Sequence, residues 1–94
     1  MPQQISYSDF QIIRKACGSP AVNYIFKQPT LAFSIDNFET GSGIFWNADT
    51  TAGTGSIHGY IPPGGNKEFD IRVGTVSIMG SGGGTQIVEV MGLF

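Results

Sequence analysis

Short apolar runs that end at turn-forming residues are the feature that most limits what this chain can fold into. In residues 31–36 and 69–73, large apolar residues alternate with smaller or polar ones, which is the period-two pattern of a half-buried strand. Glycine, proline and asparagine end such runs about every 8–12 residues, a spacing typical of all-β domains. We therefore predict a mainly β fold, a small antiparallel β-sandwich or barrel of six to seven short strands within residues 21–26, 31–36, 44–46, 57–61, 69–73, 75–79 and 87–91.

One segment near the N-terminus carries helical signals instead. Ser8 and Gln11 have the spacing of a capping box, and Phe10, Ile13 and Cys17 fall on one face of a helix. Gly18 is placed to end that helix. The same residues also alternate as a strand would. The caps favour one short N-terminal helix over residues 9–17.

The C-terminal quarter of the sequence reads as a hairpin. Residues 75–79 and 87–91 are two β-like runs on either side of the glycine-rich segment 80–84, so we expect them to pair with each other. A chain of 94 residues suits a single domain. We therefore predict that residues 1–94 form one β-rich domain.

The residues needed for common kinds of catalysis and ligand binding are scarce. The chain has one cysteine, Cys17, and one histidine, His58, with no nucleophile motif around either of them. Two such residues are too few for a zinc site within one chain, and no lysine follows a glycine as a phosphate-binding loop requires. We predict no catalytic residues, no metal site and no cofactor, so the protein is not expected to be an enzyme.

Charge and the chain ends limit the partners. Only 13% of residues are charged and the net charge is −2, without the basic cluster of a nucleic-acid platform. No run of residues is apolar enough to span a membrane, and the first residues do not resemble a signal peptide. We expect a chain made in the cytoplasm that binds neither nucleic acid nor membrane, and incorporation into a virion fits these features. The compartment in which it works is left open.

One polar and aromatic segment could bind a sugar. Trp46 is followed by Asn47 and Asp49, and an exposed tryptophan beside amide and carboxylate groups can stack on a glycan and bind it by hydrogen bonds. The competing interpretation places Trp46 in the core. The sequence leaves both open.

Apolar residues beyond the needs of a small core suggest contacts with other chains. Hydrophobic residues make up 40% of the sequence, and its last four residues are Met91, Gly92, Leu93 and Phe94. We expect Tyr60, Met91, Leu93 and Phe94 to form an interface. The leading hypothesis is a non-enzymatic structural or interaction protein, which self-associates as a homo-oligomer or serves as a subunit of a larger assembly such as a phage or virus particle. The alternative is a small carbohydrate-binding module that uses Trp46, Asn47 and Asp49.

Overall fold

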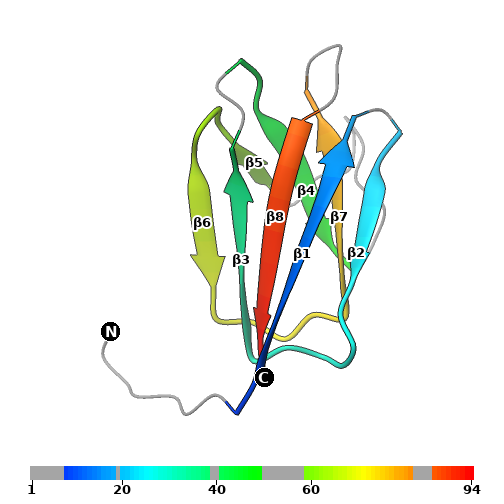
Figure 1. The fold of residues 1–94 in the computed structure, drawn as a ribbon, viewed down its shortest axis with the longest axis vertical. Helices are drawn as coiled ribbons and strands as arrows, with labels where there is room; N and C mark the ends of the chain where they lie inside the picture. Colours follow the sequence, from blue (N-terminus) through cyan, green and yellow to red (C-terminus); the bar gives the residue numbers. More distant parts are fainter. Residues whose placement is uncertain (1–7, 19, 39–40, 50–58, 82–85) are drawn as a thin grey trace.

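The fold is that of a computed structural model, which describes residues 8–18, 20–38, 41–49, 59–81 and 86–94. This part of the chain contains eight β-strands and no helix (Figure 1). In chain order the strands are β1 (Phe10–Cys17), β2 (Val22–Ile25), β3 (Ala32–Asn37), β4 (Ile44–Ala48), β5 (Gly59–Ile61), β6 (Asn66–Phe69), β7 (Thr75–Gly80) and β8 (Gln86–Leu93).

The strands form two antiparallel sheets of four strands each. The first, which we call the β1 sheet, has the strand order β1-β8-β3-β6, and the second, the β2 sheet, has the order β2-β7-β4-β5. Strands β4 and β5 are consecutive in the chain and pair with each other. Every other pair of successive described strands is divided between the two sheets. The chain therefore crosses repeatedly from one sheet to the other.

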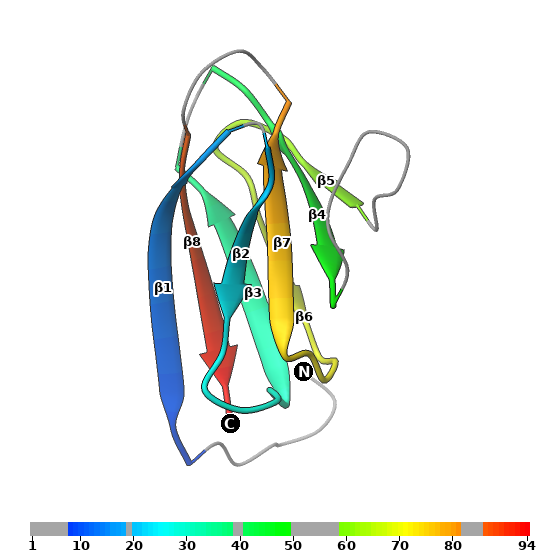
Figure 2. The same ribbon diagram turned by 90° about the vertical axis from the view of Figure 1, so that its right-hand side faces the viewer.

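The two sheets lie as two layers with one apolar core between them (Figure 1). Phe33 from the β1 sheet meets Trp46 from the β2 sheet edge to face, with ring centroids 5.9 Å apart. Phe69 stacks on Phe33 at 4.9 Å. Of the two architectures predicted, this layered pair of sheets is the arrangement of a sandwich. Figure 2 views the side on which β1 and β2 are the edge strands.

The predicted N-terminal helix over residues 9–17 is wrong, because Phe10–Cys17 is strand β1. All eight of its residues are in register with β8, from Phe10 opposite Leu93 to Cys17 opposite Gln86. The Ser8 hydroxyl, expected to cap a helix, donates to the Phe94 carbonyl instead. Pairing with β8 gives alternate residues of this edge strand their backbone hydrogen bonds, and the distant partner strand decides between the two patterns.

The predicted C-terminal hairpin is also wrong. Strand β7 pairs with β2 and β4, whereas β8 pairs with β1 and β3 in the opposite sheet. Most of the glycine-rich segment between them lies outside the described residues. Both strands bury alternate side chains in the shared core, but they do so from opposite sheets and share no hydrogen-bond ladder.

The predicted strand at residues 69–73 is wrong except at Phe69, because the observed strand β6 covers Asn66–Phe69 and residues 70–73 are not in a strand. Thr30 forms hydrogen bonds with the segment that follows Phe69. Its backbone N–H donates to the Val73 carbonyl, and its hydroxyl accepts from the Val73 N–H. The same hydroxyl lies 3.2 Å from the Ile71 carbonyl, to which it donates. These bonds hold residues 71–73 against the loop before β3, which leaves Ile71 exposed and Val73 in the core.

Candidate interaction face

The outer face of the β1 sheet gathers apolar side chains at one of its ends. Ile13 packs against the core, so its neighbours along β1, Phe10 and Ile12, fall on the opposite, outer face. Phe10 lies opposite Leu93 and Ile12 opposite Met91 in the register with β8. Phe10 is 59% exposed and Ile12 50%, and Met91 and Leu93 are half-buried. We call these four residues the apolar corner.

A charged row crosses the middle of this face. The Arg14 guanidinium donates to Glu89 Oε2 from Nη2 at 2.9 Å and from Nε at 3.2 Å. Asp36 on β3 lies opposite Glu89 on its other side. Beyond the row, the Arg14 guanidinium also lies over the exposed Phe38 ring, 5.1 Å from its centroid. The ion pair therefore separates the apolar corner from Phe38.

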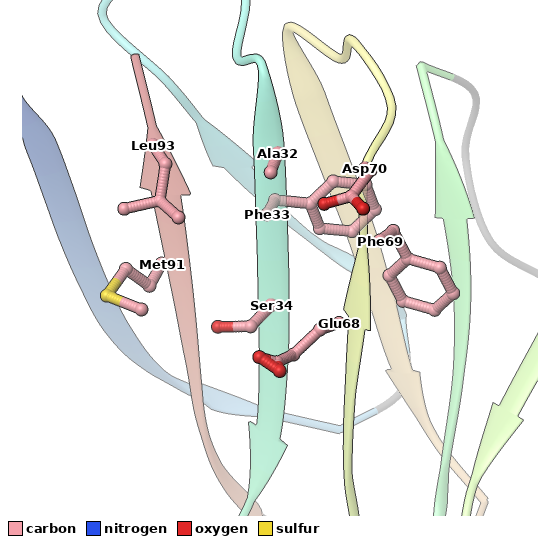
Figure 3. A pocket seen from close by; sticks show the side chains of 8 residues that line it. All are labelled: Ala32, Phe33, Ser34, Glu68, Phe69, Asp70, Met91 and Leu93. Atoms are coloured by element: carbon pink, nitrogen blue, oxygen red, sulfur yellow. The ribbon is translucent and has the colours of Figure 1, made fainter. Parts of the chain in front are cut away.

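A groove runs beside the apolar corner, between β8, β3 and β6 (Figure 3). Its main hollow, of about 310 Å³, is lined by Ala32, Phe33, Ser34, Glu68, Phe69, Asp70, Met91 and Leu93. A smaller hollow of about 230 Å³ continues it toward Asp36 and Asn66, and Ser34, Glu68 and Met91 line both. The groove is thus apolar along β8 and acidic along β6.

The four predicted interface residues do not lie on one common surface. Met91 and Leu93 belong to the apolar corner. Tyr60 is exposed, but it lies on β5 in the other sheet, where its ring is 5.5 Å from that of Phe45. Phe94 is only 4% exposed and packs edge-on against Phe26. Phe94 is therefore a core residue, and only Met91 and Leu93 share one surface.

Phe10 and Ile12 are the members of this surface that the sequence analysis missed. The helical interpretation placed Phe10 on a buried face with Ile13, and it left Ile12 without a role. The signal that could have found them is the alternation of Phe10 and Ile12 with Gln11 and Ile13. Read as a strand, that alternation puts both residues on the face opposite Ile13.

The predicted sugar-binding residues do not form an exposed group. Trp46 is 6% exposed and Asn47 1%, and both lie on β4 between β5 and β7. Asp49 directly follows β4 and has a φ of 60°, and its Oδ1 accepts hydrogen bonds from the backbone N–H groups of Gly74 and Thr75, each at 3.0 Å. Trp46 therefore packs in the core, and Asp49 holds a turn.

The groups considered for catalysis are not brought together in the described part of the chain. Cys17 is buried and its Sγ lies 2.7 Å from the Tyr24 hydroxyl. Burial raises the pKa of the Cys17 thiol, so it is a weak nucleophile near neutral pH. His58 lies outside the described residues. Within them, no three His, Cys, Asp or Glu side chains are grouped so that they could hold a metal ion.

No protein-family model matches this sequence, and no curated protein does either. Among the described residues, no helix has the length and apolar character needed to cross a bilayer. What can be inferred about function therefore rests on the geometry of the β1 sheet's outer face. That face presents exposed apolar side chains beside charged ones.

Proposed function

We propose that this protein is a non-enzymatic structural or interaction protein, which works as a homo-oligomer or as a subunit of a larger protein assembly. The observation that carries the proposal is the apolar corner on the outer face of the β1 sheet. Phe10 and Ile12 expose half or more of their surface beside Met91 and Leu93. Contiguous exposed apolar side chains of this kind mark contact surfaces on small proteins.

The energetics of the apolar corner favour association. Covering a large aliphatic or aromatic side chain contributes about 1.5–3 kcal/mol when its burial is complete. Phe10 is 59% exposed and Ile12 is 50% exposed, so a partner surface that covers them removes a large part of their apolar area from water. The sheet beneath is held by paired backbones on both sides of β8, which makes it a rigid platform for contact.

The strand order supports the same class of function. Eight strands in the orders 1-8-3-6 and 2-7-4-5 correspond to a jelly roll, an architecture found in viral capsid and lectin domains. A fold does not establish function by itself. It is consistent with a subunit of a phage or virus particle, and it is equally consistent with the carbohydrate-binding alternative. The burial of Trp46 and Asn47 is why we place assembly first.

A single substitution on the apolar corner tests the proposal. Ile12→Asn removes an exposed apolar contact without changing the net charge. If the protein self-associates through this face, light scattering after size-exclusion chromatography will show an oligomer for the wild type and about tenfold weaker association for the variant. The matched control is Ile25→Asn, because Ile25 is also exposed but lies on β2 of the other sheet.

Two results would contradict this proposal. One is a wild-type protein that stays monomeric at every concentration and forms no complex with other proteins of its source. The other is an Ile25→Asn variant that weakens association as much as Ile12→Asn does. A shift of Trp46 fluorescence when glycans are titrated would favour the carbohydrate-binding alternative.

A further inference from the structure

The charged side chains of the described residues divide into two groups. Those away from β6 have partners: Arg14 pairs with Glu89, Lys27 with Asp9, Lys15 donates to the Asn23 carbonyl, and Asp49 accepts from backbone N–H groups. The others make neither an ion pair nor a hydrogen bond within the described part of the chain. They are Asp36, Lys67, Glu68, Asp70 and Arg72.

All five of these unpaired charges lie in one region of the molecule. Asp36 is on β3 opposite Asn66 of β6, Lys67 and Glu68 are on β6, and Asp70 and Arg72 follow directly after β6. Three carboxylates and two cations therefore lie on β6, just after it, and on the neighbouring strand β3, and no ion pair joins them within the described residues. Unpaired charges of both signs in one region can form ion pairs with a partner molecule.

The carboxylates of this region lie at the groove. Glu68 and Asp70 line its main hollow opposite Met91 and Leu93, as Figure 3 shows. The row from Met91 through Ser34 to Glu68 crosses the sheet from β8 to β6, because Ser34 lies opposite both of them. The groove therefore fits a segment that presents an apolar side chain next to a cationic one.

The chain itself carries such a segment immediately beside the groove. Ile71 is 47% exposed and Arg72 is exposed next to it. Both follow Asp70, a residue of the groove wall. In an interface with two-fold symmetry, each copy presents the same patch, so a protruding segment close to a complementary groove can fill the groove of its partner while its own groove is filled in return.

We propose that a second copy of this chain occupies the groove, with its Ile71 against Met91 and Leu93 and its Arg72 against Glu68 and Asp70. This inference rests on the proposed function and names the partner surface. In a two-fold symmetric contact of this kind, both grooves are filled at once. The apolar corner lies next to the groove along β8, and the partner covers part of it.

A charge-reversal experiment tests this arrangement. In sedimentation equilibrium, Arg72→Glu and Glu68→Arg should each weaken dimerisation about tenfold or more, because each puts like charges into contact. The double variant should recover most of the wild-type affinity, because the pair is present again with its signs exchanged. The dimer affinity of Arg72→Gln should lie between that of the wild type and that of Arg72→Glu.

The matched control is Lys67→Glu. It changes the net charge by the same amount as Arg72→Glu, at another unpaired cation on β6 that does not line the groove. Its dimer affinity should stay within about threefold of the wild type, as expected for a charge that makes no contact in the interface. Circular dichroism and urea unfolding of each variant establish that it is folded before its affinity is compared.

The outcomes separate this inference from the function on which it rests. The inference is overturned if Ile12→Asn weakens association but Arg72→Glu does not. It is also overturned if the double variant recovers none of the lost dimer affinity. In both cases the groove is not the contact, while self-association stands. If Lys67→Glu weakens association as strongly as Arg72→Glu, net charge alone explains the effect and the inference fails. A wild type that remains monomeric at every concentration overturns this inference. It overturns the proposed function as well only if the protein also forms no complex with other proteins of its source.

Discussion

The Tyr24 hydroxyl ties the two sheets together through a buried polar contact. It lies 2.9 Å from the Val88 carbonyl, to which it donates, and 2.7 Å from Cys17 Sγ. Tyr24 belongs to the β2 sheet, whereas Val88 and Cys17 belong to the β1 sheet. A polar group buried in an apolar core needs a hydrogen-bond partner, because leaving it without one costs free energy.

Tyr24→Phe should therefore destabilise the protein by about 1–3 kcal/mol, because it removes the buried hydroxyl that donates to the Val88 carbonyl and lies within hydrogen-bond distance of the Lys15 carbonyl and Cys17 Sγ. Urea unfolding followed by circular dichroism measures this change. Tyr60→Phe is the control, since Tyr60 is exposed and surface substitutions usually change stability by less than about 0.5 kcal/mol. An equal effect of the two substitutions would contradict the role of the Tyr24 hydroxyl.

The same residue predicts a pH dependence. Burial, and next the hydrogen bond with Cys17, raise the pKa of the Tyr24 phenol far above its usual value. The folded state therefore keeps the proton that the unfolded chain loses above about pH 10, so the stability that the phenol contributes is present below that pH and lost above it. The difference in unfolding free energy between the wild type and Tyr24→Phe should narrow as the pH rises from about 8 to about 11. A difference that stays constant over this range would contradict the prediction.

At the scale of secondary-structure elements, β1 is the segment in which local and tertiary signals conflict. As a strand, it places Ile13 toward the core and Ile12 on the outer face. As a helix, it would place Phe10, Ile13 and Cys17 on one side. The pairing with β8 favours the strand, because all eight residues are in register with β8 and alternate residues form backbone hydrogen bonds with it.

Substitutions at two neighbouring residues of β1 test whether the segment is a strand with an inner and an outer face. Ile13→Asn should destabilise the fold by about 1–2 kcal/mol because it puts an amide against the core, whereas Ile12→Asn should leave the unfolding free energy within about 0.5 kcal/mol of the wild type. Urea unfolding at a concentration where the protein is monomeric makes the comparison. Equal destabilisation by both variants would mean that Ile12 is not on an outer face.

On the scale of the whole molecule, the topology places most backbone pairing between strands that are distant in the chain. β1 pairs with β8 at the other end of the sequence, and β3 pairs with both β6 and β8. Closing such long loops costs entropy before any contact forms, so domains of this kind fold slowly.

Refolding should accordingly take milliseconds to seconds, which is the range of sandwiches with non-local pairing. Trp46 is the single tryptophan and packs against Phe33 of the opposite sheet, so its fluorescence reports when the two sheets join. Stopped-flow dilution from urea measures this rate. A Trp46 signal complete within microseconds would contradict the crossing topology.

Much of this protein could be predicted from the sequence because strands and turns leave local signals. The alternation in residues 31–36 and the apolar runs around Trp46 and Ile78 identify strands that the structure confirms as β3, β4 and β7. The mainly β class followed from them. In the candidate site, Met91 and Leu93 were predicted from the apolar C-terminal residues, but Phe10 and Ile12 were not.

What tertiary structure alone decided is which strands are neighbours and which face each residue occupies. Nothing local distinguishes β7 and β8 as a hairpin from β7 and β8 in separate sheets, because hydrogen-bond partners are chosen by the packing of the whole core. The same choice made β1 a strand, buried Phe94, and brought residues 10, 12, 91 and 93 together from opposite ends of the chain. The sequence by itself determined that the chain forms strands, since side-chain alternation is a local property. The interaction face exists only once distant strands have paired.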